Sequence, residues 1–358
     1  MEDELEMMLE AFSEKLVEQQ VGRPKTVLAV LAVLTLLILP GALNLSVKPS
    51  TEAILPGDDP VVESLDSLRG KFYGDTTYVV FKSEDVRDPE LFKSMERIQN
   101  RLEKSENVYT TRSAAEMAQN KYGYIPEDRE KLENAKYGST VSEDYRTALI
   151  SVRADTQAKS SEIKKLHDEI QTAIDLESPP AETDLTGYNM IDLATFNVII
   201  NDFIRITGVS FGAVLGVLYF VFRDRRKMMM PIVPVMFALV WMLGLGGWLG
   251  ANLTIISMVS AAMIMGLGID FGIHVTKKYY STNGGKEGMS ETMVELSRGL
   301  LGGSITTGIG FLSLLFANLS GMHALGIFLF TGIISAYIGA VVLLPVLIIM
   351  IESEEKIL

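Results

Sequence analysis

Apolar and polar stretches alternate along the chain, and six of the apolar stretches are long enough to cross a lipid bilayer. About 20 apolar residues are needed, because a helix rises about 1.5 Å per residue and the hydrocarbon core is about 30 Å thick. The pattern therefore predicts a membrane α-helical bundle of six transmembrane helices. The predicted spans are 26–46, 203–222, 229–249, 253–277, 300–319 and 324–351.

The stretch 47–202, between the first two spans, has the mixed charged and apolar composition of a water-facing domain. Alternating apolar residues predict strands there, and helical spacing of apolar residues predicts helices. Two strand–helix–strand units follow one another, as in an α/β ferredoxin-like sandwich. The polar segment 114–142 lies between the units as a helical insertion. The predicted strands are 76–83, 107–111, 145–154 and 184–190, and the predicted helices are 89–104 and 157–176.

Three shorter segments flank the spans. Helical spacing of apolar residues predicts one amphipathic helix at 1–25, docked under the bundle, and a second at 283–299. Residues 352–358 are expected to form a tail. A cleaved signal peptide is an alternative for the first span, but this leader is long and mostly acidic, whereas a secretion signal begins short and basic. In the leader, helical intervals separate Leu5, Met8, Leu9, Phe12 and Leu16.

Lysine and arginine are concentrated in alternate connections. The second and third spans are joined by "FRDRRKMMMP", and the connection between the fourth and fifth contains Lys277, Lys278, Lys286 and Arg298. The connections "GANLT" and "NLSGMH" carry no formal charge. By the positive-inside rule, both termini and the amphipathic helices are expected in the cytoplasm, and the α/β domain is expected outside the cytoplasm of a multi-pass protein of the cell membrane.

Composition narrows the possible functions. The chain has no cysteine and only three histidines, which lie too far apart in sequence for a typical metal motif. We expect no metal and no cofactor, and the absence of a phosphate-binding loop argues against nucleotide as a source of energy. The net charge of −13 argues against nucleic acid as a partner. No catalytic constellation appears in 47–202, so an enzyme is not expected.

Asp270 is the only formally charged side chain between Met228 and Thr276. An ionised Asp at the centre of a membrane helix costs about 2.5–3.5 kcal/mol on insertion scales. The side chain can bind a proton, because an apolar environment disfavours the charged form, or it can face polar partners within a bundle. Gly266 and His274 precede and follow it by four residues, so all three share one helix face.

Hydroxyl groups on the fifth span are the candidate partners of Asp270. A carboxyl that alternates between protonated and ionised forms beside hydroxyls is suited to a proton relay formed by Asp270, His274 and the hydroxyls. Three alternatives remain: a permanently protonated Asp that holds two helices together, a His274 that anchors at the membrane interface, and hydroxyls that bond to their own helix. The candidate hydroxyls belong to Ser304, Thr306, Thr307 and Ser313.

Small residues mark predicted helix contacts. Gly208, Gly212 and Gly216 form a double G-x-x-x-G on the second span, which allows another backbone to approach closely. Gly266 leaves space beside the carboxyl of Asp270. The third span has prolines near its start and glycines near its end, so it is able to bend.

The stretches "GLGIDFGIHVTKKYY" and "LTGYNMIDLATFNVIINDF" make the chain resemble the resistance-nodulation-division (RND) superfamily. The resemblance covers the whole chain and is closest to the mycobacterial-membrane-protein-large (MMPL) and hopanoid-exporter branch, which is related to Patched and the sterol-sensing domains. It implies a transporter that uses proton-motive force to export hydrophobic or amphipathic, often lipid-like, substrates. It also implies that Asp270 carries the proton, with the hydroxyls of the fifth span as its neighbours.

Two features depart from the family pattern. Phe271 follows the aspartate where the mycobacterial branch commonly has tyrosine, and the chain has one six-span repeat where typical members have two. We therefore expect a homodimer or larger oligomer, a sister six-span half, or a chain that is one half of something longer. Alternative functions are a lipid-sensing or scaffolding membrane protein that pumps nothing and a protein-export subunit related to SecF.

Overall fold

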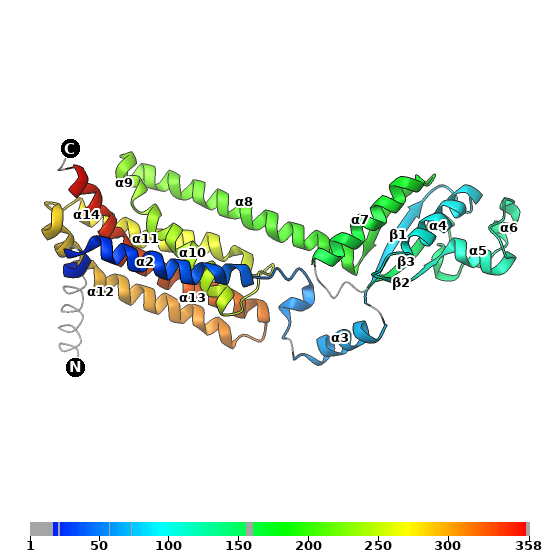
Figure 1. Ribbon diagram of the computed structural model, residues 1–358, viewed down its shortest axis with the longest axis horizontal. Helices are drawn as coiled ribbons and strands as arrows, with labels where there is room; N and C mark the ends of the chain where they lie inside the picture. The colour runs from blue at the N-terminus through cyan, green and yellow to red at the C-terminus, as the bar shows by residue number, and fades with distance from the viewer. Residues whose placement is uncertain (1–16, 21, 57, 73, 155–159, 356–358) are drawn as a thin grey trace. The chain divides into compact units, whose positions relative to one another are not determined.

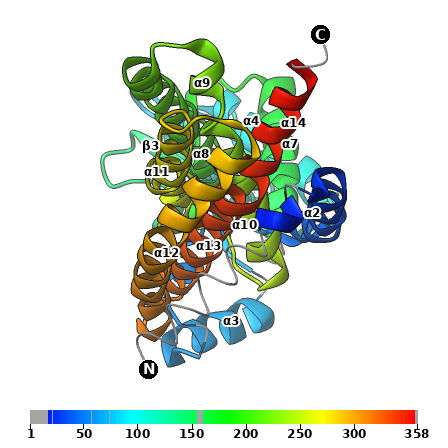
Figure 2. The same ribbon diagram turned by 90° about the vertical axis from the view of Figure 1, so that its left-hand side faces the viewer.

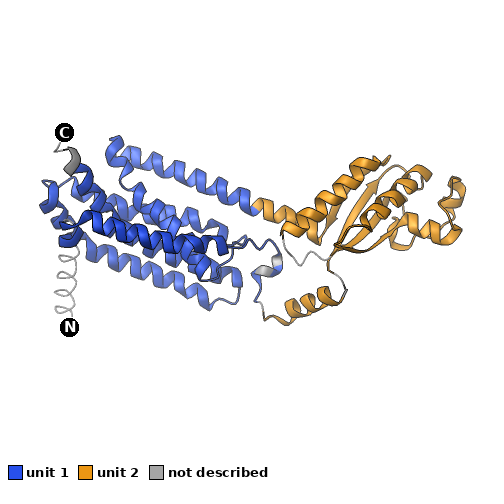
Figure 3. Ribbon diagram, in the orientation of Figure 1, with its two compact units in different colours: residues 1–56, 199–358 blue, residues 57–198 orange. Residues whose placement is uncertain are grey.

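The computed structural model describes residues 17–20, 22–56, 58–72, 74–154 and 160–355, so most of the predicted leader helix and the end of the tail lie outside the described residues. The chain divides into two compact units (Figures 1 and 3). Residues 1–56 and 199–358 form the helix bundle, and residues 57–198 form the α/β domain. The predicted combination of a membrane bundle with a ferredoxin-like domain is confirmed.

Six helical segments within the described residues are long and apolar enough to cross a membrane, so this is a multi-pass membrane protein. The first consists of α2 (Pro24–Ile38) and the 3-10 helix η1 (Leu39–Asn44), and the second is α8 (Tyr188–Phe222). The third joins α9 (Arg225–Met229) to α10 (Ile232–Trp248). The others are η4 and α11 (Ser257–Val259, Ser260–Tyr279), α12 and η5 (Gly285–Leu312, Ser313–Phe316), and α13, η6 and α14 (Ser320–Ile338, Gly339–Leu343, Leu344–Glu355).

Helices α10, α11 and α13 pack together at the core of the bundle. Glycines allow the close approach: a Cβ atom added at Gly332 would lie 2.5 Å from Ile264, and one added at Gly268 would lie 3.0 Å from Ala336. Such contacts are typical of membrane helices, where packing rather than the hydrophobic effect holds one helix against another.

Two helices extend beyond the predicted spans that they contain. Helix α8 begins at Tyr188, fifteen residues before the predicted span 203–222, because the last strand ends at Gly187, whose φ of 110° is a conformation that favours glycine. Residues 188–190 are therefore helical and not part of a strand. The amphipathic segment 283–299 and the fifth span are one continuous helix, α12, since nothing between them interrupts the helical pattern.

The fourth span begins later than predicted. Leu253 forms a parallel bridge with Val47, in which its backbone N–H donates to Ser46 O and its carbonyl accepts from Lys48 N, both at 2.9 Å. This extended pairing holds the chain out of the helical conformation, and α11 starts only at Ser260. Residues 47–56 consequently belong to the helix bundle and not to the α/β domain.

The α/β domain contains a four-stranded antiparallel sheet in the order β2-β3-β1-β4. Its units are β1 (Thr76–Lys82), α4 (Pro89–Leu102) and β2 (Val108–Ser113), followed by β3 (Thr147–Ala154), α7 (Ser160–Glu177) and β4 (Glu182–Gly187). The predicted insertion forms α5 (Ala114–Tyr122), α6 (Arg129–Glu133) and the turn η3 (Gly138–Thr140), while α3 (Pro60–Phe72) precedes the sheet. This is the ferredoxin-like order, in which the two units interleave.

One face of the sheet packs on α4 and α7. Val79 and Phe81 of β1 are fully buried there, together with Ile150 of β3. Phe92 of α4 and Ile170 of α7 cover them. Alternate residues along each strand point to this core, as period-two patterning predicts.

An ion-pair cluster holds the start of α4 to the insertion. The side chain of Arg87 donates two hydrogen bonds of 3.0 Å to the Asp85 carboxylate, its guanidinium lies 3.7 Å from the ring centroid of Tyr145, and Arg129 reaches the same carboxylate. The hydrogen bonds from Arg87 hold the pKa of Asp85 well below its usual range.

We expect Asp85→Asn to destabilise the α/β domain by about 1.5–3 kcal/mol at neutral pH, because hydrogen bonds to a charged partner are lost. The depressed pKa contributes stability above the unfolded carboxyl pKa of about 3.9, so the difference between wild type and variant should shrink as the pH falls below that value. Amide hydrogen exchange in β3 measures the effect. Glu84→Gln, a change at an exposed neighbour, should leave exchange unchanged; equal protection in all three proteins contradicts the prediction.

Candidate functional site: an exposed aspartate on the fourth span

Asp270 lies on the side of α11 that points away from the packed bundle. The opposite side of the helix is apolar and buried: Ile264, Met265 and Val275 are at most 1% exposed. This apolar side of α11 packs against the rest of the bundle, so the carboxyl of Asp270 on the opposite side lies at the surface of the bundle. No hydrogen bond or ion pair joins Asp270 to any other residue that the structure describes.

Gly266 and His274 lie on the same exposed face, as their spacing predicts. No atom lies within 4 Å of a Cβ placed on Gly266, so the space beside the carboxyl is open. Leu267 and Met263, each 38% exposed, continue this face toward the start of the helix. The three predicted residues are thus together, with the histidine one turn nearer the basic end of the span.

Three of the four predicted hydroxyl partners make hydrogen bonds within their own helix. Ser304 is buried and donates to Leu301 O (2.9 Å), and exposed Thr306 donates to Gly302 O (2.9 Å). Ser313 donates to Gly310 O (2.7 Å). These oxygens retain lone pairs that can accept a hydrogen bond, which a protonated carboxyl can donate and a carboxylate cannot. Thr307 is half-buried, and no bond of its hydroxyl to a described residue is recorded.

The glycine face of α8 is open. Gly208, Gly212 and Gly216 have no atom within 4 Å of an added Cβ, so no described helix of the same chain approaches them. Helix α8 contacts the bundle through other residues, including Leu218, which packs near Ile269 of α11. The predicted close helix contact at these glycines is therefore absent within the described part of one chain.

Helices α8, α11 and α12 occupy one side of the bundle, and α2 occupies the other (Figure 2). This side carries the open glycines of α8, the exposed carboxyl of Asp270 on α11 and the exposed Thr306 on α12. In a membrane, lipid would face an ionised carboxyl there unless another surface covers it, and the cost is about 2.5–3.5 kcal/mol.

Several contacts in the bundle were not predicted. A Cβ at Gly247 would lie 1.9 Å from Gly41 O, so the first and third spans touch backbone to backbone. The third span is interrupted at Met230 and Pro231, between α9 and α10.

The final span contains a π-helix, η6. The buried side chain of Gln20 donates from Nε2 to Val341 O in this π-turn (3.0 Å), and Val17 packs in the same cluster. The end of the leader therefore docks against the bundle, as predicted. Phe271 packs edge-on against Tyr337, with ring centroids 6.5 Å apart, so a tyrosine of the last span lies beside the residue that departs from the family pattern.

The two basic connections meet at one end of the bundle. Lys227 lies over the ring of Tyr280, 4.5 Å from its centroid, and Lys278 pairs with Glu295. The backbone N–H of Gly285 donates to the hydroxyl of Tyr279 (2.9 Å), which ties the start of α12 to the end of α11.

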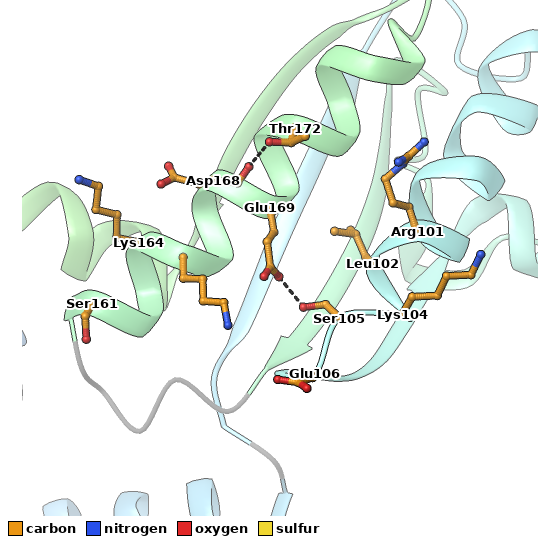
Figure 4. Close-up of a pocket in the computed structure, with 11 residues that line it drawn as sticks. Arg101, Leu102, Lys104, Ser105, Glu106, Ser161, Lys164, Asp168, Glu169 and Thr172 are labelled. Carbon is orange, nitrogen blue, oxygen red and sulfur yellow. Dashed lines mark hydrogen bonds between the residues drawn. The ribbon is translucent and has the colours of Figure 1, made fainter.

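No group of three or more potential metal ligands occurs among the described residues. A hollow of about 780 Å³ in the α/β domain lies between the end of α4 and the first part of α7 (Figure 4). Ser105 donates to Glu169 across it. Lysines and carboxylates both line it, and their charged groups are largely in contact with solvent, so it does not select one class of ligand.

Comparison with known proteins agrees with this architecture. The model of the MMPL family matches residues 53–354, a range that includes the α/β domain and the helix that carries Asp270. The chain is also 24% identical to the "Putative membrane protein MJ1562" of Methanocaldococcus jannaschii over 374 aligned residues, which cover 97% of this chain and 96% of that protein. MMPL proteins are membrane transporters and not enzymes. The chain belongs to the MMPL family.

Proposed function

We propose that this chain is one repeat of a secondary transporter of the RND type. A second copy, or a sister six-span chain, supplies the other repeat and covers the open face of α8, α11 and α12. Proton transfer at Asp270 drives export of a hydrophobic or amphipathic, lipid-like molecule. Membership of the MMPL family supports the class of function.

The observation that carries the proposal is the exposure of Asp270 on the outer side of a well-packed span. A carboxyl in contact with lipid is costly, whereas a carboxyl at the seam between two repeats is shielded and can take up and release a proton as the repeats rearrange. The open glycines of α8 and the Gly266 gap allow another helix to approach it closely. Proton relays in transporters are commonly built on such intramembrane acids.

The hydroxyls contribute as acceptors in this scheme. Thr306 already donates to its own helix, so its oxygen favours the protonated form of a carboxyl that comes within reach. His274 supplies a second titratable group on the path to the basic end, which the positive-inside rule places in the cytoplasm. The α/β domain then faces outward.

The test is proton flux in liposomes that contain the wild-type protein, under an imposed pH gradient, with and without a series of candidate lipids and amphiphiles. A transporter shows flux that depends on one class of lipid and is absent from protein-free liposomes. Binding of a lipid without any flux would instead identify a non-pumping lipid sensor, and the proposal would fail.

A further inference from the structure

The sheet of the α/β domain has a second face that its own helices leave open. On β1, Tyr78 is 37% exposed and Val80 is half-exposed, while Val79 between them is buried under α4 and α7. Leu149 of β3 is also half-exposed and is paired with Val80. None of the three belongs to a hydrophobic cluster of the described residues, so the centre of this face is apolar and uncovered.

Charges of opposite sign lie at two diagonally opposed corners of this open face. Arg112 of β2 and Arg153 of β3 form the basic corner, and neither is ion-paired with another residue in the described ranges. Glu182 and Asp184 of β4 form the acidic corner. Asp184 pairs with Lys82, so this corner retains a net charge of one negative unit.

The strand register places these corners. Arg153 is paired with Thr76 at one end of β1, and Glu182 is paired with Lys82 at the other end. With strands about 4.8 Å apart and about 3.3 Å per residue along each strand, the two corners are separated by roughly 18 Å. Tyr78 and Leu149 lie along the other diagonal.

A face with this layout is complementary to itself. A two-fold axis along the Tyr78–Leu149 diagonal places the basic corner of one copy over the acidic corner of the other. Tyr78 and Leu149 each then face their own counterpart. The strands of the two sheets cross at nearly a right angle, which is one of the two known ways in which sheets pack face to face.

Two hollows on the same face can receive side chains from the opposing sheet. One, of about 170 Å³, is lined by Arg112, Ser151 and Arg153. The other, of about 530 Å³, is lined by Tyr78 and by Tyr188, which is 48% exposed. A surface with an apolar centre, charged corners and hollows has the anatomy of a protein interface.

We propose that the open sheet faces of two copies of this chain pack against each other in this orthogonal, two-fold arrangement. The inference rests on the two-copy assembly of the proposed function and names the surface that joins the α/β domains. Its support comes from the sheet alone and is independent of Asp270.

The chain has no cysteine, so a cross-linker that reacts with thiols can join two copies only at the position where a cysteine is introduced. Stacked sheets lie about 10 Å apart, which is too far for a disulfide, so a short bifunctional maleimide is the appropriate cross-linker. In full-length protein in nanodiscs, Leu149→Cys should cross-link to its own counterpart with high yield. Lys164→Cys, on exposed α7 at the other face of the sheet, is the matched control and should not.

Charge reversal tests the orientation in the same cysteine background. One variant carries Arg112→Glu and Arg153→Glu, and the other carries Lys82→Glu, Glu182→Lys and Asp184→Lys, which reverses the internal ion pair without deleting it. Each variant alone brings like charges together at both contacts and should lose most of the cross-linking. Their co-expressed mixture restores opposite charges at both contacts and should recover it.

Absence of cross-linking at Leu149, or charge variants that cross-link like the parent, would overturn the proposed interface. Far-UV circular dichroism of each variant checks that the fold is retained. If a charge-reversed variant is misfolded, the orientation is tested instead by cross-linking the Leu149→Cys protein at low and at high salt. High salt should reduce the cross-linking, because salt screens exposed charges. A failed interface with intact proton flux rejects only this surface. Loss of lipid-dependent flux with intact cross-linking rejects the proposed function.

Discussion

Asp270→Asn is expected to abolish lipid-dependent proton flux in reconstituted liposomes, down to the level of protein-free vesicles. Asparagine has nearly the shape of aspartic acid but cannot take up or release a proton. Since Asp270 is the only formally charged side chain in the membrane-spanning part of its helix before Lys277, no neighbouring carboxylate on that helix replaces it. The measurement is the initial rate of internal pH change after a pH jump.

The same substitution should not reduce thermal stability. Asp270 makes no hydrogen bond or ion pair within the described residues, so asparagine at this position breaks no contact that holds the helices together. Glu287→Gln, at an exposed carboxyl in the first turn of α12, is the matched control for the flux and should retain it. If Asp270 were instead a structural hydrogen bond between helices, Asp270→Ala would lower the melting temperature and Asp270→Asn would retain flux.

Gly247→Ala is expected to separate the first span from the third. The added methyl would lie 1.9 Å from the backbone oxygen of Gly41, and backbone atoms cannot rotate out of the way as a side chain can. Overpacking of this kind costs typically 1–3 kcal/mol, and the upper end is expected here. The indole N–H groups of Trp241 and Trp248 donate to Thr35 Oγ1 (2.9 Å) and Ile38 O (3.2 Å) at this contact, and both bonds should weaken.

Intrinsic fluorescence reports on this contact directly, because Trp241 and Trp248 are the only two tryptophans in the chain. A shifted emission maximum and a lower melting temperature in detergent are expected for the variant. Gly299→Ala, at a helical glycine with no atom within 4 Å, should leave both unchanged or raise stability slightly through helix propensity. An unchanged spectrum and melting temperature for Gly247→Ala would show that the two spans are not held in this contact.

Local patterns predicted the spans and the α/β order well, because both depend on short-range periodicity. Membrane length sets the number of apolar residues in a helix, and alternation along a strand sets which side chains reach the core. The errors occurred at boundaries. Tyr188 reads like the continuation of a strand, and nothing near Leu253 in the sequence shows that it pairs with Val47, some two hundred residues earlier.

For the candidate site, the spacing of Gly266, Asp270 and His274 placed them on one helix face. Whether that face points into the bundle or out of it could not be predicted. The answer depends on which side of α11 packs against α10 and α13, and that packing depends on close contacts such as the one between Ile264 and Gly332. The expected proximity of Asp270 to the hydroxyls of the fifth span stays a prediction, since Ser304 and Thr306 bond within their own helix.

The sequence by itself determined that this protein spans a membrane with six helices, that it carries a ferredoxin-like domain and that a lone carboxylate lies within its fourth span. Periods of 3.6 and 2 residues, together with the thickness of a bilayer, are enough for those conclusions. Only the tertiary structure decided that Asp270 points out of the bundle, that the glycines of α8 are uncovered and that one face of the sheet is open. Those facts arise from contacts between residues far apart in the chain, where shape complementarity between whole helices and strands selects one packing among many that have the same local pattern.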